Sequence, residues 1–306
     1  MEVITINDFE YLNIIQDNLK NIPIWCDEEA LKCYSRKELI KVCKKDNILA
    51  VFFIPLDNLG VRREFRYFPY VSPILLKEKN NLQEKEILKV IFEYIFRKYD
   101  YTFIPLHPDF KNISSISSKG GFVEMRHTHV VDDILKLDDL SSKLKNHINH
   151  AKKEVDIAID NDYSNFEFEY AIKGEKKEII NRTILAQNLV RNNKGILIKA
   201  IKDGRVVAGL TVIYDNKWAY LLHSYQKEKI RGTVPYLILK AIEYVFEQYK
   251  ISYFDFEGSV IDDIDNFFAS FNAKIVNYPY IIYAKEKESF FQLIERSKNI
   301  EGRMDK

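Results

Sequence analysis

Two acidic residues, Asp255 and Glu257, have the chemistry and the spacing for proton transfer. They alternate with Phe254 and Phe256, so a strand would place both carboxylates on one face and both rings on the other. Neighbouring carboxylates raise each other's proton affinity, which brings one of them closer to neutral pH. The alternative interpretation is structural, with the pair capping a strand end and Gly258 supplying the turn.

A histidine and a tyrosine share one face of another expected strand. His223 and Tyr225 stand two residues apart, and side chains with this spacing point the same way on a strand. Both join the two carboxylates in the candidate catalytic set, although a buried, hydrogen-bonded histidine without a site role is the commoner outcome for such a position. Ser224 lies outside any GxSxG turn, so no nucleophilic serine is predicted.

The start of a long amphipathic helix forms a candidate anion site. The first amides of a helix lack partners within the helix and carry partial positive charge. Thr233 is expected to cap this helix, and Pro235 suits its first turn. The candidates for binding a phosphate or a carrier group are Lys229, Arg231, Gly232 and Thr233. A plain capped helix with a solvated arginine is the alternative.

Basic side chains gather on another helix, expected over residues 138–154. Its apolar residues fall on one helical stripe, so the basic ones face elsewhere. The stripe consists of Leu140, Leu144, Ile148 and Ala151. A cationic helix surface attracts phosphates, whereas a solvated helix flank needs no ligand. The candidates for contacting an anionic part of a substrate are Lys145, His147, His150 and Lys152.

Local patterns predict the elements that position these residues. Capping boxes at Asn7 with Glu10, Ser35 with Glu38 and Asn81 with Glu84 indicate three helix starts. Helices are expected over 7–19, 35–45, from 81, over 109–117, 138–154, 175–191, from 233, over 261–271 and from 288. Strands are expected over 48–55, 61–68, 101–106, 122–132, 196–202, 205–214, 217–223, 253–256 and 274–284. The turn at Asp203-Gly204 predicts an antiparallel hairpin.

One pattern occurs twice. Glu93, Tyr94, Phe96 and Tyr99 recur as Glu243, Tyr244, Phe246 and Tyr249, each 150 residues later. In both places a helix, a strand, a short helix and another strand are expected in that order. This favours a duplicated module over accidental matching in a chain rich in tyrosine and phenylalanine.

Bulk composition indicates a globular protein large enough for two domains. The chain has 306 residues, of which 46% are hydrophobic and 30% charged. Lys plus Arg number 46 against 45 Asp plus Glu, so no overall field recruits DNA or anionic lipid.

Neither a metal site nor a membrane span is predicted. Cys26, Cys33 and Cys43 are odd in number, form no CxxC pair and have no nearby histidine, so neither a disulfide framework nor a cysteine-based zinc site is indicated. The longest apolar run, residues 48–56, is too short to cross a bilayer, and the first residues do not resemble a secretion signal. We therefore expect a cytoplasmic protein without a tightly bound cofactor.

The second half of the sequence resembles the GNAT acyltransferase fold. It has two helices, three meandering strands, a helix, a strand, a helix and a strand. The resemblance lies in residues 140–159, in residues 200–226, and in residues 253–259 with the later residues 267–280. The duplication resembles the double-GNAT arrangement of the Fem family of non-ribosomal peptidyltransferases and of FemAB-like acyltransferases. The resemblance implies an α/β (α+β) protein of tandem GNAT-like domains, each a mixed, mostly antiparallel sheet flanked by helices. We expect a degenerate domain over 1–135 and a domain carrying the transfer site over 136–306.

The same resemblance implies transfer of an acyl or aminoacyl group to an amine. The donor would be an acyl-CoA, bound as a substrate, or an aminoacyl-tRNA, and the acceptor a small-molecule or peptide amine. The amine would attack directly, without a covalent enzyme intermediate. Two alternatives stay open: a GNAT-derived module that binds a small amino-containing metabolite or peptide without turnover, and a plain acetyl-CoA-dependent N-acetyltransferase.

Overall fold

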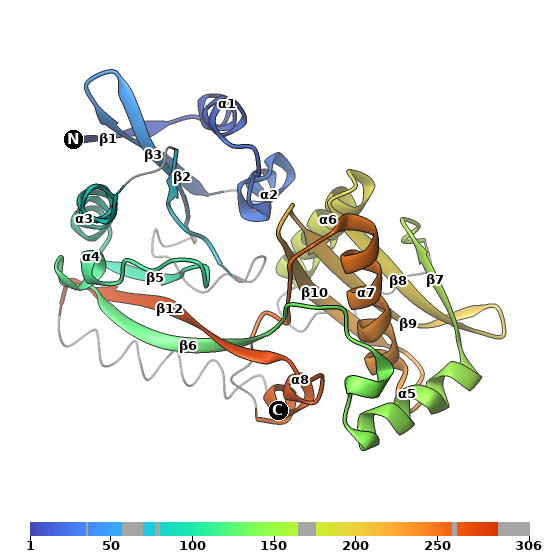
Figure 1. Ribbon diagram of the computed structural model, residues 1–306. Helices are drawn as coiled ribbons and strands as arrows, with labels where there is room; N and C mark the ends of the chain where they lie inside the picture. Colours follow the sequence, from blue (N-terminus) through green and yellow to red (C-terminus); the bar gives the residue numbers. More distant parts are fainter. Residues whose placement is uncertain (35, 57–69, 77–79, 165–175, 259–261, 287–306) are drawn as a thin grey trace. The chain divides into compact units, whose positions relative to one another are not determined.

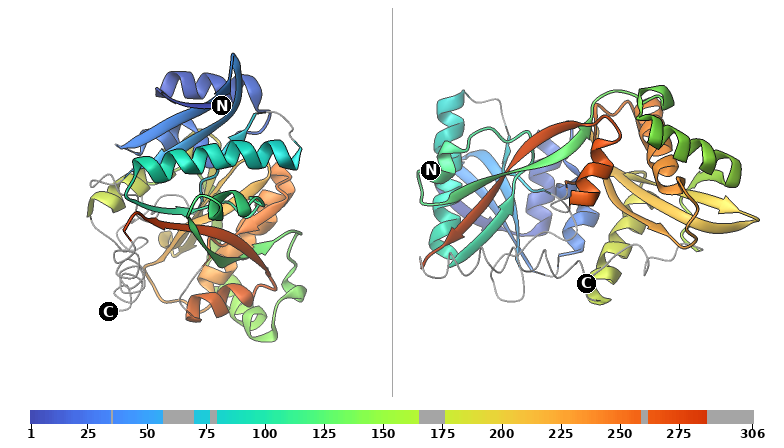
Figure 2. Two further views of the ribbon diagram at one scale, coloured as in Figure 1. Left: turned by 90° about the vertical axis from the view of Figure 1, so that its left-hand side faces the viewer. Right: turned by 90° about the horizontal axis from the view of Figure 1, so that it is seen from below.

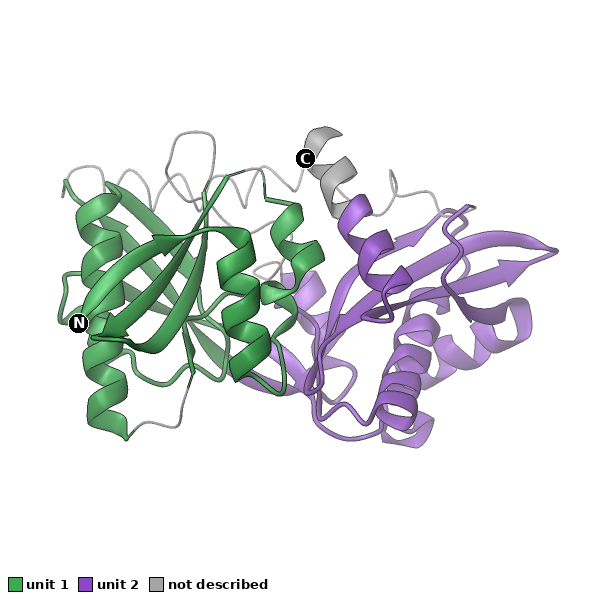
Figure 3. Ribbon diagram, turned by 90° about the horizontal axis from the view of Figure 1, so that it is seen from above, with its two compact units in different colours: residues 1–126, 277–306 green, residues 127–276 purple. Residues whose placement is uncertain are grey.

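The computed structural model describes residues 1–34, 36–56, 70–76, 80–164, 176–258 and 262–286 (Figure 1). The chain divides into two compact units, which Figure 3 colours separately. The first unit comprises residues 1–126 and 277–306, and the second unit comprises residues 127–276. The predicted domain boundary after residue 135 stays a prediction.

The first unit contains a four-stranded antiparallel sheet with strand order β1-β2-β3-β4. Its strands are β1 (Glu2–Ile6), β2 (Lys37–Lys44), β3 (Asn47–Pro55) and β4 (Ile74–Leu75). Its helices are α1 (Asp8–Asn18), α2 (Glu28–Lys32), α3 (Asn81–Lys98) and α4 (Ser114–Ser117), with a 3-10 turn at Ile24–Cys26. Helix α3 packs against β1, β2 and β5 (Tyr101–Pro105), and β5 pairs antiparallel with β12 (Lys274–Ala284) (Figure 2).

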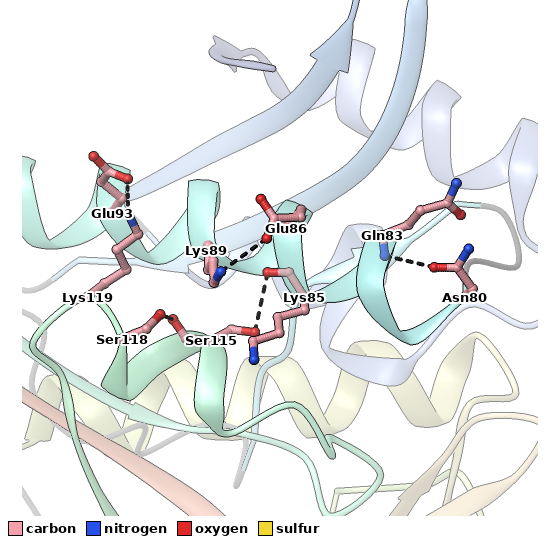
Figure 4. A network of polar contacts seen from close by, with 9 residues as sticks. All are labelled: Asn80, Gln83, Lys85, Glu86, Lys89, Glu93, Ser115, Ser118 and Lys119. Carbon is pink, nitrogen blue, oxygen red and sulfur yellow. Dashed lines mark hydrogen bonds and ion pairs between the residues drawn. The ribbon is translucent and has the colours of Figure 1, made fainter.

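Side-chain caps start helices α1, α2 and α3 of the first unit. Asn7 caps α1 by accepting from the Glu10 amide at 2.8 Å, as predicted. Helix α3 is capped by Asn80 and not by Asn81, because Asn80 Oδ1 accepts from the Gln83 amide at 2.9 Å (Figure 4). The predicted cap of α3 is therefore wrong by one residue, whereas the helix itself begins at Asn81.

The helix expected over residues 35–45 is wrong, because Lys37–Lys44 forms β2. This strand is hydrogen-bonded on both sides, to β1 and to β3, and it buries Leu39, Ile40 and Val42. Pairing on two edges and burial of these side chains outweigh the local Ser-x-x-Glu signal. The helix expected over 109–117 is shorter, at Ser114–Ser117. The strand expected over 61–68 and the helix expected from 288 lie outside the described residues.

Six strands of the second unit follow the order β6-β11-β10-β9-β8-β7. They are β6 (Phe122–Val131), β7 (Asp156–Asp160), β8 (Gly195–Lys202), β9 (Arg205–Tyr214), β10 (Trp218–Gln226) and β11 (Tyr253–Asp255). Neighbouring strands are antiparallel except for β10 and β11, which are parallel. The predicted meander of β8, β9 and β10 is confirmed. Strands β6 and β12 each contain residues of both units.

Helices cover both faces of this part of the sheet (Figure 1). They are α5 (Ser142–Glu154), α6 (Lys176–Arg191), α7 (Thr233–Tyr249) and α8 (Asp262–Ala269), with a 3-10 turn at Leu137–Asp139. Helix α7 packs on β8, β9 and β10 with α5 beside it, whereas α6 contacts β8 and β9 from the other face. All four residues of the predicted α5 stripe are buried. Within the described ranges, no helix has both the length and the apolar character that a bilayer span needs.

A bulge in β10 sets the direction of the side chains that follow it. Leu221 pairs with Val212, and both belong to the core beneath α7. The register shifts between Leu221 and His223, so His223 pairs with Thr211. Paired residues on adjacent strands share a face, and Thr211 is the residue directly before Val212 in β9, so the two point to opposite faces. The extra residue therefore turns His223 away from the α7 core.

Candidate functional site

Asp255 is fully buried at the end of β11. Its Oδ1 accepts from Thr128 Oγ1 at 2.5 Å and from the Glu257 amide at 2.6 Å. The carboxylate thus joins the end of β11 to β6 and fixes the turn that follows. These are the contacts of a strand-end cap.

Glu257 lies beyond the strand, in a left-handed conformation with φ of 66°. Phe254 and Phe256 both enter the core as expected, with ring centroids 5.3 Å apart. Because β11 stops at Asp255, however, the two carboxylates do not share a regular strand face. Gly258, with φ of 72°, continues the expected turn. The half-buried Glu257 side chain is consequently positioned by a turn and by the Asp255 cap.

His223 and Tyr225 share one face of β10, as predicted, and both are buried. Thr211, the partner of His223, lies 3.3 Å from the Tyr163 hydroxyl, so this face of the sheet carries several polar side chains. Asp255 pairs with Tyr220, three residues before His223 and five before Tyr225. At a strand rise of about 3.3 Å per residue, the two side chains lie roughly 10 and 17 Å further along β10 than Asp255.

The start of α7 depends on a glycine. Gly232 is the N-cap residue with φ of 84°, and a Cβ added there would lie 1.9 Å from the His147 carbonyl oxygen. Thr233 is the first helical residue, so the expectation that it caps the helix is wrong. Its amide donates to the Ile230 carbonyl at 3.2 Å. Its buried hydroxyl has no hydrogen-bond partner within the part of the chain that the structure describes.

Two predicted residue sets meet where α5 packs beside α7. Arg231 Nη2 lies 2.6 Å from His147 Nε2, although the residues are 84 positions apart. Burial and the positive charges of Arg231, Lys143 and His150 lower the pKa of His147. The neutral imidazole accepts from the guanidinium, which leaves Arg231 as the cation of this contact. Lys152 lies above the Tyr236 ring at 5.7 Å from its centroid.

Three predicted residues stand apart from this contact. Lys145 forms an ion pair of 2.7 Å with Asp138, whose pKa is lowered by the hydrogen bond from Lys145. His150 and Lys229 are exposed.

Sequence reasoning missed a cluster formed by β6 and α8. His127 Nε2 and His129 Nε2 each lie 2.9 Å from Asp265 Oδ1. These hydrogen bonds lower the pKa of the Asp265 carboxyl. The available signal was His-Thr-His within the strand expected over 122–132, since alternation places both imidazoles on one face.

Comparisons with known proteins identify the fold. No protein-family model and no curated protein sequence matches the chain. The structure is similar to that of FemX, with a TM-score of 0.64 and 12% identity over 96% of this chain and 100% of that one. It is also similar to the C-terminal domain of a putative lysylphosphatidylglycerol synthetase from Agrobacterium fabrum, with a TM-score of 0.56 and 11% identity over 95% and 97% of the two chains.

A third similar structure is a tandem GNAT protein from the clavulanic acid biosynthesis pathway. Its TM-score is 0.54 and its identity 10%, over 93% of this chain and 98% of that one. The chain therefore has a tandem GNAT fold. More particularly, its likeness to FemX over nearly the whole chain agrees with the FemAB-like arrangement that the resemblance in the sequence implied.

Proposed function

We propose that this protein is a GNAT/FemAB-like acyltransferase that moves an acyl or aminoacyl group from a CoA- or tRNA-type donor to an amine. The acceptor is a small molecule or a peptide. The supporting observation is the unit β10-α7-β11, in which a helix connects two parallel strands. Such a connection places the helix N-terminus at the edge where both strands end, which is where α/β proteins bind ligands.

The start of α7 is the proposed donor end. Its first amides favour a phosphate group, and Arg231 can bind phosphate oxygens through two N–H groups. The hydroxyl of Thr233 supplies a further polar group at the first helical residue. Lys152 and His147 come from α5 to the same place and support binding of an anionic carrier.

Glu257 is the proposed proton acceptor, with Asp255 as a positioning residue that holds its backbone amide. The deprotonated amine nitrogen forms a bond to the acyl carbon, and the bond from that carbon to the carrier's sulfur or oxygen breaks. The proton taken from the amine goes to Glu257, and the leaving group gains a proton. His223 and Tyr225 are the proposed proton donors for that group.

A turnover assay with acyl-CoAs and aminoacyl-tRNA tests the assignment. Glu257→Gln is expected to lower kcat by roughly 100-fold or more, the effect of losing a general base. Donor affinity stays unchanged, because Arg231 and α7 are untouched. The matched control is Glu243→Gln, which changes a carboxylate of α7 that pairs with Lys240. Unchanged turnover in both Glu257→Gln and Asp255→Asn would remove the catalytic assignment.

A second candidate is a module that binds an amino-containing metabolite or peptide without turnover. The observation that favours it is the complete burial of Asp255 in the role of a strand-end cap. A ligand at 100 times its dissociation constant stabilises its protein by about 2.7 kcal/mol. Thermal stabilisation by an amine ligand, with no product formed from any donor, identifies this alternative.

A further inference from the structure

Three side chains in the second unit converge on one point outside the proposed transfer site. His127 and His129 project from the same face of β6, and Asp265 approaches from α8. One ligand atom from each of the three residues lies within 4.8 Å of the other two. Neutral imidazole and carboxylate are both common metal ligands, and two histidines with one carboxylate form a set that binds zinc.

The distances suit a small ion after a slight expansion. Both histidine nitrogens lie 2.9 Å from the same Asp265 oxygen, so that oxygen stands where the imidazoles converge. Zinc bonds of 2.0 to 2.2 Å at tetrahedral angles separate neighbouring ligand atoms by about 3.3 Å. The two histidine–aspartate separations would widen by about 0.4 Å, and rotation of the imidazoles, whose ligand atoms lie within 4.8 Å of each other, would bring the third separation to the same value.

Burial gives the cluster a closed side and an open side. The His129 side chain is 1% exposed, and its ring packs against Phe268 with centroids 6.3 Å apart. Its Nδ1 is buried without a hydrogen-bond partner among the described residues. By contrast, the side chains of His127 and Asp265 are 42% and 31% exposed. An ion can therefore enter from the His127 side, where a fourth position stays accessible to water.

The cluster is tied to the acidic turn of the same unit. Thr128, between the two histidines, donates its hydroxyl to Asp255. A Cβ added at Gly258 would lie 2.9 Å from the His127 carbonyl oxygen, so the two backbones are in close contact. A bound ion would thus join α8 to the segment of β6 that supports Asp255 and the turn at Glu257.

We propose that His127 Nε2, His129 Nε2 and Asp265 Oδ1 bind one divalent transition-metal ion of the zinc type, with water in the fourth position. The oxygen-preferring ions Mg²⁺ and Ca²⁺ are poorly matched by two imidazoles. The proposal does not depend on acyl transfer, because it concerns only binding of the ion.

Titration of the chelator-treated full chain with Zn²⁺ and with Co²⁺ tests this site. We expect one ion per chain, and visible Co²⁺ absorption of the strength typical of four-coordinate sites. His127→Gln and Asp265→Asn are each expected to lower Zn²⁺ affinity by about 100-fold or more. Loss of a residue that only hydrogen-bonds to a metal ligand costs about 10- to 100-fold, and loss of a ligand itself should cost at least as much as the upper value. The matched control is His150→Gln, an exposed histidine of α5 whose loss leaves affinity unchanged.

The variants remain informative if the buried position does not tolerate change. His129→Gln risks unfolding, whereas the half-exposed positions of His127 and Asp265 accept amide side chains, and circular dichroism verifies the folds of these variants. Absence of stoichiometric Zn²⁺ and Co²⁺ binding overturns the proposal. So does binding that is equally tight in His127→Gln and Asp265→Asn, because the ion would then lie elsewhere, for example on the cysteines of the first unit.

Discussion

Helices α3 and α7 belong to the repeated pattern, yet they begin in different ways. Asn80 caps α3 through the Gln83 amide, so a side chain of the helix's own segment satisfies its start (Figure 4). Helix α7 begins at a left-handed glycine and has no side-chain cap. Arg231 precedes it, and the Thr233 hydroxyl is buried. One copy of the module thus completes its helix start internally, and the other offers a start suited to an anion.

The repeated tyrosines also have different partners in the two copies. Tyr94 and Tyr99 both donate to Glu38, a buried carboxylate of β2 that also accepts from Lys98 at 2.5 Å. In the other copy, Tyr249 stacks on Tyr214 with centroids 4.3 Å apart, and Tyr244 lies edge-on to Tyr249. The expected order of helix, strand, short helix and strand is present in both copies. A shared pattern therefore supports a polar cluster in the first unit and an aromatic one in the second.

The largest effect is expected from Gly232→Ala, which alters the start of α7. A left-handed conformation costs an alanine roughly 1 to 2 kcal/mol, and the contact with the His147 carbonyl adds overpacking. We expect the free energy of unfolding to fall by about 3 kcal/mol, measured by urea denaturation. Gly204→Ala is the matched control: its φ is 74°, but nothing lies within 4 Å of the added Cβ. If both variants lose the same stability, the close approach of Gly232 to the His147 backbone of α5 does not add to the cost.

An intermediate effect is expected from Glu38→Gln, which breaks the cluster of Tyr94 and Tyr99. Burial opposes ionisation of Glu38, but hydrogen bonds from Lys98, the two tyrosines and Thr5 outweigh it and lower the pKa of its carboxyl. Loss of the charged acceptor is expected to cost about 2 kcal/mol at pH 7.

The same cluster predicts a pH dependence. Because the pKa is lowered in the folded protein, the stabilisation is complete above the unfolded value of about 4.3 and is lost as pH falls through the folded value. Urea denaturation from pH 7 to pH 3 should show the wild type losing its advantage over Glu38→Gln. Glu10→Gln, which alters the half-exposed pair with Lys41, should cost less than about 1 kcal/mol. A gap between wild type and Glu38→Gln that does not vary with pH would refute the assignment.

The smallest effect is expected from Asn80→Ala at the start of α3. Loss of an asparagine cap typically costs about 1 kcal/mol. Thermal unfolding of the protein should report this loss. The matched control is Gln83→Ala, which changes an exposed side chain but keeps the backbone amide that donates to Asn80. If Asn80→Ala is neutral, the contrast between the two helix starts does not rest on capping.

Sequence patterns predicted the elements whose signals are local. The cap at Asn7, the buried stripe of α5 and the meander from β8 to β10 all follow from spacing within a few residues. The strand β2 was missed because its cause is pairing on both edges with segments distant in sequence. No local pattern reports such pairing.

The candidate site was harder to predict because its geometry depends on irregular backbone. Alternation was extended to Glu257, whereas β11 ends at Asp255 and the chain turns. Similarly, the bulge in β10 decides which face His223 occupies, and a bulge leaves no clear mark in the sequence. His127 and His129 carried a readable signal, but their partner Asp265 comes from a helix more than a hundred residues later.

Strand β12 affects the order in which the polypeptide can fold during translation. It pairs with β5, so the first unit includes residues from both ends of the described chain. The second unit is one uninterrupted segment, residues 127–276, so it leaves the ribosome before residues 277–284 of β12, which belong to the first unit. Synthesis of the first unit therefore begins before that of the second unit, but the first unit receives its last strand segment, from β12, only after the second unit is complete.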